Sequence, residues 1–381
     1  MSAARPLFVS LLLLSAFHLH DSTAGQESGT PPDPVIPPSS TEPEVEPPPE
    51  KKPEWWPESW PFTLHGGAYL WHYQPFVDGV DENTELYAAY FLLDVPWDAF
   101  RFHFEPRFRN TKLRPFFESN VWVQEVYLEW KPSGADGPAL KAGKLYSRFG
   151  RFWDGSFFGN VPYLDGLKLD PDYGVSLEGT QPLAGDVSHE YALQYFTVDG
   201  STNGSLQDRD TLSIDGARQR RSTVARWAPR LALGEASSVA AGASGQVFQA
   251  DFPSGAEDDT VTRWGGDVEL VHRDWTAFGE LARQRGRSVL DFPLPGQSSD
   301  DVEYAWAGIE KRCGPLSVRY NFSSGKYRDQ DVRETIHQPG LVYDLDEHVR
   351  LYLEFDYWDR SEPGAGGVVD RSLNFVLNVN F

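Results

Sequence analysis

The amino-acid sequence predicts an all-β fold, a transmembrane antiparallel up-and-down β-barrel of about sixteen strands. Apolar residues recur at every second position between Phe62 and Phe381, a period that places them on one face of a strand. After the chain start, no window approaches the eighteen or so unbroken apolar residues of a membrane-spanning helix. The connectors between alternating segments are short and long in turn, as expected when the two ends of one barrel differ.

The first 24 residues are predicted to be a secretory signal peptide. One basic residue, Arg5, precedes an apolar run from Phe8 to Phe17, and small residues then favour cleavage after Ala24. The apolar run is too short to cross a bilayer as a helix. Residues 1–24 are therefore not expected to belong to the fold.

Residues 25–61 are predicted to form a linker rich in Pro and Glu. The prolines prevent regular strand pairing and favour polyproline geometry, at roughly 3.1 Å per residue. The segment can act as a semi-rigid periplasmic arm or remain a solvated leader. The end of this segment and the residue after it carry rings typical of the level of lipid headgroups, namely Trp55, Trp56, Trp60 and Phe62. The barrel is therefore expected to occupy residues 62–381.

Three segments show the two-residue period most clearly, and they suggest which residues face inward. In 100–109, phenylalanines occupy one face, Pro106 interrupts the pattern, and the polar face carries Arg101, His103, Glu105 and Arg107. In 349–357, an apolar face opposes a polar face that includes Arg350 and Glu354. The segment 373–381 ends on the aromatic Phe381. Inside lipid an unpaired backbone N–H or C=O costs several kcal/mol, so such strands must close into a ring.

Strands of about ten residues cross a bilayer at a tilt, and sixteen segments of roughly that length fit the sequence. They are predicted at 62–72, 84–95, 97–107, 119–131, 138–146, 166–179, 188–198, 221–231, 238–248, 261–273, 275–286, 302–312, 315–323, 334–344, 347–359 and 370–381. Because Ala, Ser and Gly dilute the pattern over 221–248, fourteen or eighteen strands also fit.

The predicted links alternate in length along the chain. Short links are expected at 95–97, 273–275, 313–315 and 345–347. Short turns are typical of the periplasmic end of a barrel and long loops of the outer end. An even number of strands returns both termini to the periplasm.

The composition excludes several classes of function. With 56 acidic and 34 basic residues the formal charge is -22, which disfavours nucleic acid because phosphates require a basic surface. The single cysteine, Cys313, allows no intrachain disulfide. The nine histidines show no H-E-x-x-H motif, and no Cys-x-x-Cys pair exists, so no metal, cofactor or catalytic residue is predicted.

Acidic clusters in the long loops have two open interpretations. They are Asp78, Asp81 and Glu82 in one loop and Glu257, Asp258 and Asp259 in another. Such clusters can simply be solvated, or they can bind divalent cations shared with lipopolysaccharide. The sequence leaves both possibilities open.

Three stretches resemble the phosphate-selective porin family and related general porins of bacterial outer membranes. They read LKAGKLYSRFGRFWDG at 140–155, DYGVSLEG at 172–179 and GLVYDLDEHVRLYLEFDYWD at 340–359. The resemblance implies a sixteen-stranded homotrimer in the bacterial outer membrane that forms a water-filled channel for passive diffusion of small hydrophilic solutes and ions. It also implies contact with lipid and lipopolysaccharide, and an outer-membrane assembly machinery that reads Phe381. The chain has no dense ladder of Arg and Lys, so phosphate selectivity is not implied.

The resemblance also predicts a loop that narrows the channel. In the resembled barrels the third long loop folds inward, and here it corresponds to residues 147–165. Its glycines permit tight bends and its aromatic rings can anchor it, which leaves Arg148, Arg151 and Asp154 toward water. The alternative is an outer loop whose rings pack against the loop itself or a neighbouring subunit.

Charged residues on the inner face are candidates for setting ion selectivity, because side chains that line a pore control ion entry. The candidates are Arg101, His103, Glu105, Arg107, Arg350 and Glu354. Each of them can instead be a charge satisfied by its cross-strand neighbour without effect on transport. A weak preference for cations is expected from the acidic loops and the mixed inner face.

Two other classes of protein stay open at this level. Outer-membrane lipases and proteases are also barrels, and their few catalytic residues can sit at a rim. Carboxylates on one strand face, such as Glu125 with Glu129 or Glu354 with Asp356, imitate a glycosidase pair but arise routinely in polar strands. A secreted, soluble all-β carbohydrate-binding protein would likewise be rich in aromatic residues and poor in cysteine.

Overall fold

The computed structural model describes residues 62–76, 82–110, 121–134, 137–151, 171–198, 218–251, 259–286, 301–328, 331–361 and 367–381. The expected signal peptide, the expected linker and the tryptophans at its end lie outside these residues. Within the described residues, no helix is long and apolar enough to cross a membrane.

Sixteen antiparallel strands make up the part of the chain that the structure describes, as the sequence pattern predicts. They are β1 (Thr63–Pro75), β2 (Asn83–Trp97), β3 (Phe100–Asn110), β4 (Val121–Trp130), β5 (Ala139–Leu145), β6 (Asp172–Ala184), β7 (Val187–Val198), β8 (Arg218–Ala232), β9 (Ser237–Asp251), β10 (Asp259–His272), β11 (Trp275–Arg285), β12 (Asp301–Cys313), β13 (Leu316–Tyr327), β14 (Val332–Asp344), β15 (Val349–Ser361) and β16 (Val368–Asn380).

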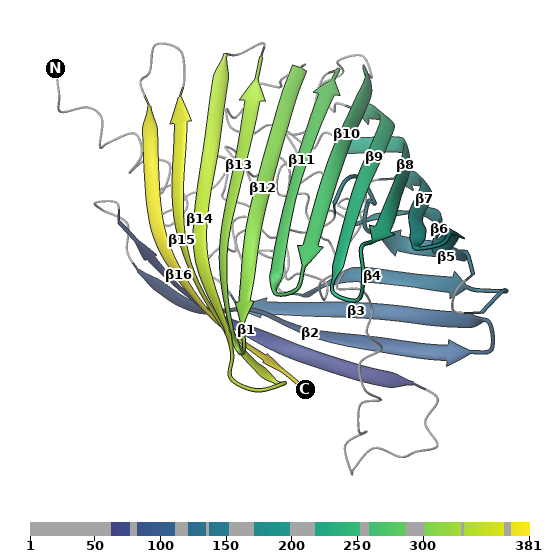
Figure 1. The fold of residues 1–381 in the computed structure, drawn as a ribbon, viewed down its shortest axis with the longest axis horizontal. Coiled ribbons are helices and arrows are strands. Elements are labelled where there is room, and N and C mark those ends of the chain that lie inside the picture. Colours follow the sequence, from purple (N-terminus) through teal and green to yellow (C-terminus); the bar gives the residue numbers. More distant parts are fainter. Residues whose placement is uncertain are drawn as a thin grey trace, which may run out of the picture.

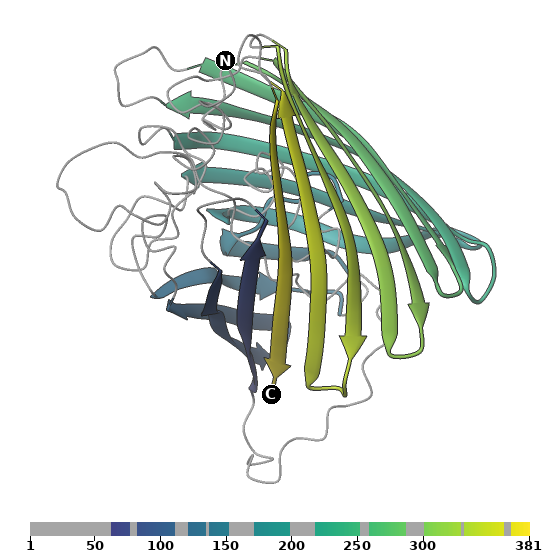
Figure 2. The ribbon, with the colours of Figure 1, turned by 90° about the vertical axis from the view of Figure 1, so that its left-hand side faces the viewer.

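The sheet closes on itself. Each strand pairs with its neighbours in sequence, and β1 also pairs with β16 in the register Gly67 to Asn380 and Tyr73 to Asn374. Figures 1 and 2 show the strands side by side in one curved wall, with β16 next to β1 where the barrel closes. Closure satisfies every strand edge, which is the condition for a sheet in lipid. The predicted all-β barrel of sixteen strands is confirmed.

Tight turns at one end of the barrel explain where the strands reverse. Two-residue turns follow β2, β6, β10 and β12, and the first residue of each has a positive φ: Asp98 (51°), Gly185 (57°), Arg273 (53°) and Gly314 (62°). This left-handed conformation matches the twist of a two-residue hairpin. The link expected at 95–97 is therefore wrong by two residues, because β2 continues to Trp97 and Asp98 makes the turn.

Other strand boundaries differ from the prediction for local reasons. Pro106 does not end β3 but lies at a bulge, where the pairing of β3 with β4 shifts between Glu105 and Pro106. The strand β15 begins at Val349 rather than 347, because the Asp346 carboxylate accepts hydrogen bonds at 2.8 Å from the backbone N–H of both His348 and Val349. This turn holds residues 345–348 out of the strand.

The outer face of the wall is apolar. Large exposed side chains recur on it at alternate positions, including Leu64, Leu70, Phe91, Phe102, Phe108, Leu128, Leu140, Leu177, Leu193, Val247, Val268, Leu270, Leu281, Ile309, Val318, Leu341, Leu353 and Phe375. Such a surface would be unfavourable in water and is suited to contact with lipid chains.

Aromatic rings gather on the outer face near the short turns. Trp97 and Phe100 flank the turn after β2, with ring centroids 6.1 Å apart, and the ring of Trp130 lies 6.3 Å from that of Phe100. Trp275 follows the turn before β11, and the ammonium group of Lys311 lies 4.9 Å from the centre of its ring. Amphipathic rings beside cations are typical of the boundary between lipid and water.

A charged residue substituted into the middle of the outer face tests whether this face contacts lipid. Leu281 is 68% exposed in the middle of β11. Leu281→Arg is expected to lower the free energy of unfolding by about 2 to 4 kcal/mol, measured by urea titration in lipid vesicles, because arginine is costly at the bilayer midplane. Leu345→Arg, in the turn before β15, serves as control and should cost about 0 to 1 kcal/mol. Equal losses at both positions would contradict a lipid-facing surface.

Candidate functional site

The polar residues that alternate with apolar ones along the strands lie on the inner face of the barrel. On β3, His103, Glu105 and Arg107 are buried, whereas Phe102 and Phe108 on the opposite face are exposed. Arg101 shares the face of His103 and is partly buried. The structure therefore places the four charged candidates of β3 side by side on the inner wall.

The two other charged candidates lie on the inner face of β15. Glu354 is buried, and the Arg350 guanidinium donates a hydrogen bond of 2.5 Å to the Asp344 carboxylate on β14. In the barrel order, β16, β1 and β2 separate β15 from β3. The six candidates thus form two groups on different parts of the wall.

The charges of the β3 group are paired with neighbours. The Arg101 guanidinium forms an ion pair at 3.0 Å with Glu129, directly opposite on β4. His103 Nδ1 lies 2.9 Å from the Asp94 carboxylate on β2, and the Arg107 guanidinium lies 2.6 Å from the Glu105 carboxylate. The wall therefore presents compensated pairs rather than a run of one sign.

The chain after β5 turns into the barrel. Residues 146–151, called the inward segment below, begin at the wall of β7. There the Gln194 side-chain amide donates a hydrogen bond of 3.0 Å to the Tyr146 carbonyl and accepts one of 2.6 Å from the Arg148 backbone N–H. The Arg148 guanidinium also lies 3.5 Å from the Glu178 carboxylate on β6.

The inward segment then reaches β9, β10 and β11. The Gly150 N–H donates to the Ser244 hydroxyl at 2.9 Å, and the Arg151 N–H donates to the Glu280 carboxylate at 2.8 Å. The Arg151 guanidinium donates to Glu269 at 2.9 Å and lies 4.0 Å from the centre of the Phe278 ring. Together with the partners on β6 and β7, these contacts take the segment along the inner wall from β6 to β11.

Apolar side chains fix the inward segment in place. Phe149 is fully buried in a cluster on the inner wall whose other members are Tyr127, Leu145, Phe196, Val224, Phe248, Ala250, Val261, Phe278, Ala282, Val302, Tyr304, Trp306, Tyr327, Val332 and Ile336. Gly150 follows with φ +68°, and a Cβ atom there would lie 2.3 Å from the Glu280 carboxylate. Only glycine fits this position without strain.

The structure places two of the three predicted residues of the loop at 147–165. Arg148 and Arg151 lie against the inner wall, each next to a carboxylate, and Asp154 lies outside the described residues. The backbone N–H groups of Gly150 and Arg151 donate to Ser244 and Glu280 on the inner wall, and most of the loop at 147–165 lies outside the described residues. The aromatic anchor in this part is Phe149.

A second network of charges lies on β8 to β10. The Arg226 guanidinium donates two hydrogen bonds, of 2.6 and 2.9 Å, to the Asp267 carboxylate. The Arg230 guanidinium donates at 2.7 Å to Glu269, which also binds Arg151. None of these four residues is among the candidates predicted from the sequence. Their signal was the same-face spacing of Asp267 with Glu269 on β10 and of Arg226 with Arg230 on β8, the latter in the stretch 221–248 where Ala, Ser and Gly dilute the alternation.

Acidic groups outnumber basic ones among the buried charged side chains of the described strands. The buried carboxylates are Glu85, Glu105, Glu129, Asp172, Glu269, Glu280, Glu334 and Glu354, and the buried Lys and Arg residues are Arg107, Lys141, Lys144, Arg263 and Arg360. Fixed charge of one sign inside low-dielectric walls raises the local concentration of counter-ions.

The fold is similar to those of several bacterial outer-membrane proteins of known structure. The outer membrane channel DcaP of Acinetobacter baumannii matches with a TM-score of 0.59 at 11% sequence identity, over 84% of this chain and 97% of that chain. An anion-selective porin from Comamonas acidovorans matches with a TM-score of 0.54 at 10% identity, over 84% and 99%. The trimer form of OmpT, an outer membrane protein of Vibrio cholerae, matches with a TM-score of 0.54 at 11% identity, over 84% and 99%.

At these identities the similarity establishes the fold, and for the fold the predicted resemblance to outer-membrane porins is confirmed. No protein-family model matches the sequence, and no curated protein matches it either.

Proposed function

We propose that this chain is a bacterial outer-membrane porin, through which small hydrophilic solutes and ions diffuse passively. The observation that carries the proposal is the two-sided wall: a closed ring of sixteen strands with an apolar outer face and a charged, hydrogen-bonding inner face. A closed ring with this polarity is stable in lipid while its inside holds water. The similarity in fold to DcaP, an outer membrane channel, supports the proposal.

The inward segment and the loop that follows it are proposed to narrow the channel. Arg148 and Arg151 place cationic groups on the inner wall next to Glu178, Glu269 and Glu280. Together with Asp154 they are proposed to form the region where a passing ion meets paired charges of both signs. On the rest of the wall, the groups proposed to line the path are Arg101, His103, Glu105, Arg107, Arg350 and Glu354.

A planar-bilayer experiment tests this function and its ion preference. Purified protein is expected to give stepwise increases in conductance, and the reversal potential in a KCl gradient is expected to show that K⁺ permeates better than Cl⁻. The physical reason is the excess of carboxylates among the buried charged side chains of the described strands. A folded barrel without conductance steps would contradict the channel. A clear preference for Cl⁻ would instead align the chain with the anion-selective porin of similar fold.

The chain is further proposed to act as a homotrimer in contact with lipid and lipopolysaccharide. The trimer form of OmpT, whose fold is similar, supports this assembly. Export by the signal peptide at 1–24 and folding by an outer-membrane assembly machinery that reads Phe381 belong to the same proposal. Residues 25–61 would then remain a linker on the periplasmic side.

A barrel enzyme is the second candidate, and one observation bears on it. The Ser237 hydroxyl lies 2.8 Å from His272 Nδ1 on the outer face near the short turns. In a catalytic triad the serine faces Nε2 and an acid holds Nδ1, so this pair has the opposite arrangement. The pair gives no support to a hydrolase, and the proposed function is transport without catalysis.

A further inference from the structure

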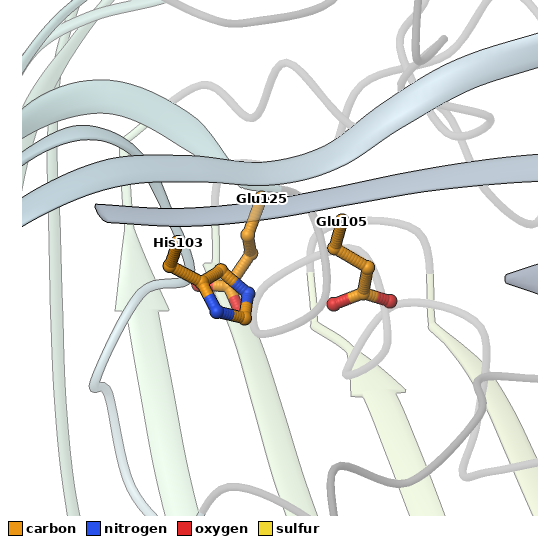
Figure 3. A group of neighbouring side chains, drawn as sticks. All are labelled: His103, Glu105 and Glu125. Atoms are coloured by element: carbon orange, nitrogen blue, oxygen red, sulfur yellow. The ribbon is translucent and has the colours of Figure 1, made fainter. Parts of the chain in front are cut away.

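Three side chains of metal-binding type meet on the inner wall of β3 and β4. His103, Glu105 and Glu125 each offer one ligand atom, and these atoms all lie within 4.8 Å of one another. Figure 3 shows the three side chains extending to the same side of the wall. His103 is 8% exposed and Glu105 is 6% exposed. The group is thus a nearly buried cluster of one imidazole and two carboxylates.

The hydrogen bond on the other side of the imidazole defines its tautomer. His103 Nδ1 lies 2.9 Å from the Asp94 carboxylate, and an ionised carboxylate can only accept a hydrogen bond. Nδ1 therefore carries the hydrogen, and in the neutral ring Nε2 keeps its lone pair. The Tyr127 ring stacks on the imidazole at 4.7 Å and holds its orientation. The His103 imidazole is therefore held in a fixed orientation, with the lone pair of Nε2 free to bind a metal ion.

His103 Nε2 has no hydrogen-bond partner although it is buried. A buried acceptor without a donor costs about 1 to 3 kcal/mol, and carboxylate oxygens nearby add repulsion. A cation between Nε2 and the carboxylates would remove both penalties. The orphaned nitrogen is therefore an observation, independent of the acidic side chains, that points to a ligand.

The other groups around the cluster leave it able to accept a cation. Arg107 pairs with Glu105 at 2.6 Å and offsets one negative charge. The Tyr146 N–H donates to the Glu125 carboxylate at 3.4 Å, and Arg148 and Lys141 lie near enough to act electrostatically on Glu125. Asp94 adds a further carboxylate behind the imidazole, and Arg101 lies 3.9 Å from it.

We infer that His103, Glu105 and Glu125 form a binding site for one divalent transition-metal ion of the zinc type. An imidazole nitrogen combined with carboxylate oxygens suits Zn²⁺ and similar ions, whereas Ca²⁺ and Mg²⁺ prefer oxygen ligands alone. Asp94 acts as the carboxylate that orients the ligating histidine, an arrangement common at metal sites. The site goes beyond the proposed channel function and does not depend on it.

The position of the site gives metal binding a structural consequence. Glu125 contacts the backbone of Tyr146, the first residue of the inward segment. An ion held by Glu125 would therefore lie at the base of the segment proposed to narrow the channel. Three protein ligands also leave coordination positions for water or a solute in the lumen.

Zinc binding by the untagged full-length protein in detergent tests the inference without any measurement of transport. Equilibrium dialysis is expected to give one tightly bound Zn²⁺ per chain, and Ca²⁺ is not expected to compete. His103→Ala and Glu125→Gln should abolish this binding. Asp94→Asn should weaken it about 10- to 100-fold. His337→Ala is the matched control, because His337 lies on the outer face against the Tyr320 hydroxyl and should not affect binding.

Two readouts keep the test decisive. The mobility shift of the barrel on gels before and after boiling shows whether each variant is folded, and Glu125→Gln preserves the shape of the side chain if His103→Ala misfolds. Substitution with Co²⁺ should give a visible spectrum with nitrogen and oxygen ligands that is absent in His103→Ala. No bound Zn²⁺ in the folded parent protein would overturn the inference. Binding that survives in folded His103→Ala and Glu125→Gln would also overturn it.

Discussion

Gly150→Val is expected to detach the inward segment from the wall and to turn uniform single-channel steps into a broad distribution of sizes. The valine Cβ would lie 2.3 Å from the Glu280 carboxylate, which accepts the hydrogen bond of the Arg151 N–H. A β-branched residue at φ +68° adds about 1 to 2 kcal/mol of backbone strain. Displacement would also break the ion pair between Arg151 and Glu269.

The loss of stability should exceed the strain alone. Urea titration in lipid vesicles is expected to show a decrease of more than about 2 kcal/mol in the free energy of unfolding, since buried polar partners lose their bonds as well. Gly185→Val is the matched control: its φ is +57°, and a Cβ there meets nothing within 4 Å. That variant should lose about 1 to 2 kcal/mol and keep uniform steps. The same behaviour in both variants would refute the wall contact as the cause.

Removing Phe381 is expected to eliminate most of the folded protein in the membrane. The Phe381 N–H donates to the Gly66 carbonyl at 2.8 Å, and the Gly66 N–H donates to the Phe381 carbonyl at 2.9 Å. These bonds close the seam between β1 and β16 at the end with short turns. The truncation leaves the Gly66 N–H and C=O without these partners, so an edge opens in the ring at its closing seam.

Two point substitutions separate the backbone bonds from the ring of Phe381. Phe381→Ala keeps both bonds and removes a ring that is 66% exposed and packs on Phe91 with centroids 6.0 Å apart. If the assembly machinery reads the aromatic residue, this variant should fold in detergent yet reach the cell surface poorly. Phe375→Ala, also on the outer face of β16, should do both normally. Full surface yield of the truncated chain would show that neither seam nor ring is needed.

The strands could be predicted from the sequence because their pattern is a direct consequence of lipid outside and polar groups inside. The pattern was weakest over 221–248, and the structure shows a physical reason. Ser244 in this stretch accepts the Gly150 N–H, and on the neighbouring strand β10 the Cβ position of Gly265 lies 3.3 Å from the Phe149 ring, so small residues make room for the inward segment. The sequence loses its clear alternation where the wall receives another part of the chain.

Strand ends were less predictable because they depend on single backbone conformations. The turn after β2 needs a left-handed residue, and Asp98 supplies it, whereas Pro96 remains within β2. Pro106 has no backbone N–H to donate, but it lies at a bulge where the pairing shifts, so the strand continues past it. Neither outcome follows from a two-residue period.

For the charged residues of the site, the face of a strand could likewise be predicted from the sequence, whereas contacts between strands could not. His103 and Glu105 could be assigned to one face because they are two residues apart on one strand. Their approach to Glu125 depends on the register of β3 with β4, in which Glu105 lies opposite Glu125. The contacts of Arg151 with Glu269 and Glu280 join residues more than one hundred positions apart. Such contacts require the closed barrel and cannot be read from local spacing.

The central claim is that the barrel encloses water, and the swelling of liposomes in hydrophilic solutes tests it most directly. Liposomes containing the folded protein should swell in small sugars at rates that fall steeply with solute size, while protein-free liposomes do not swell. If liposomes with correctly folded, membrane-inserted barrel remain as impermeable as empty ones, the polar inner wall encloses no continuous path and the account is wrong.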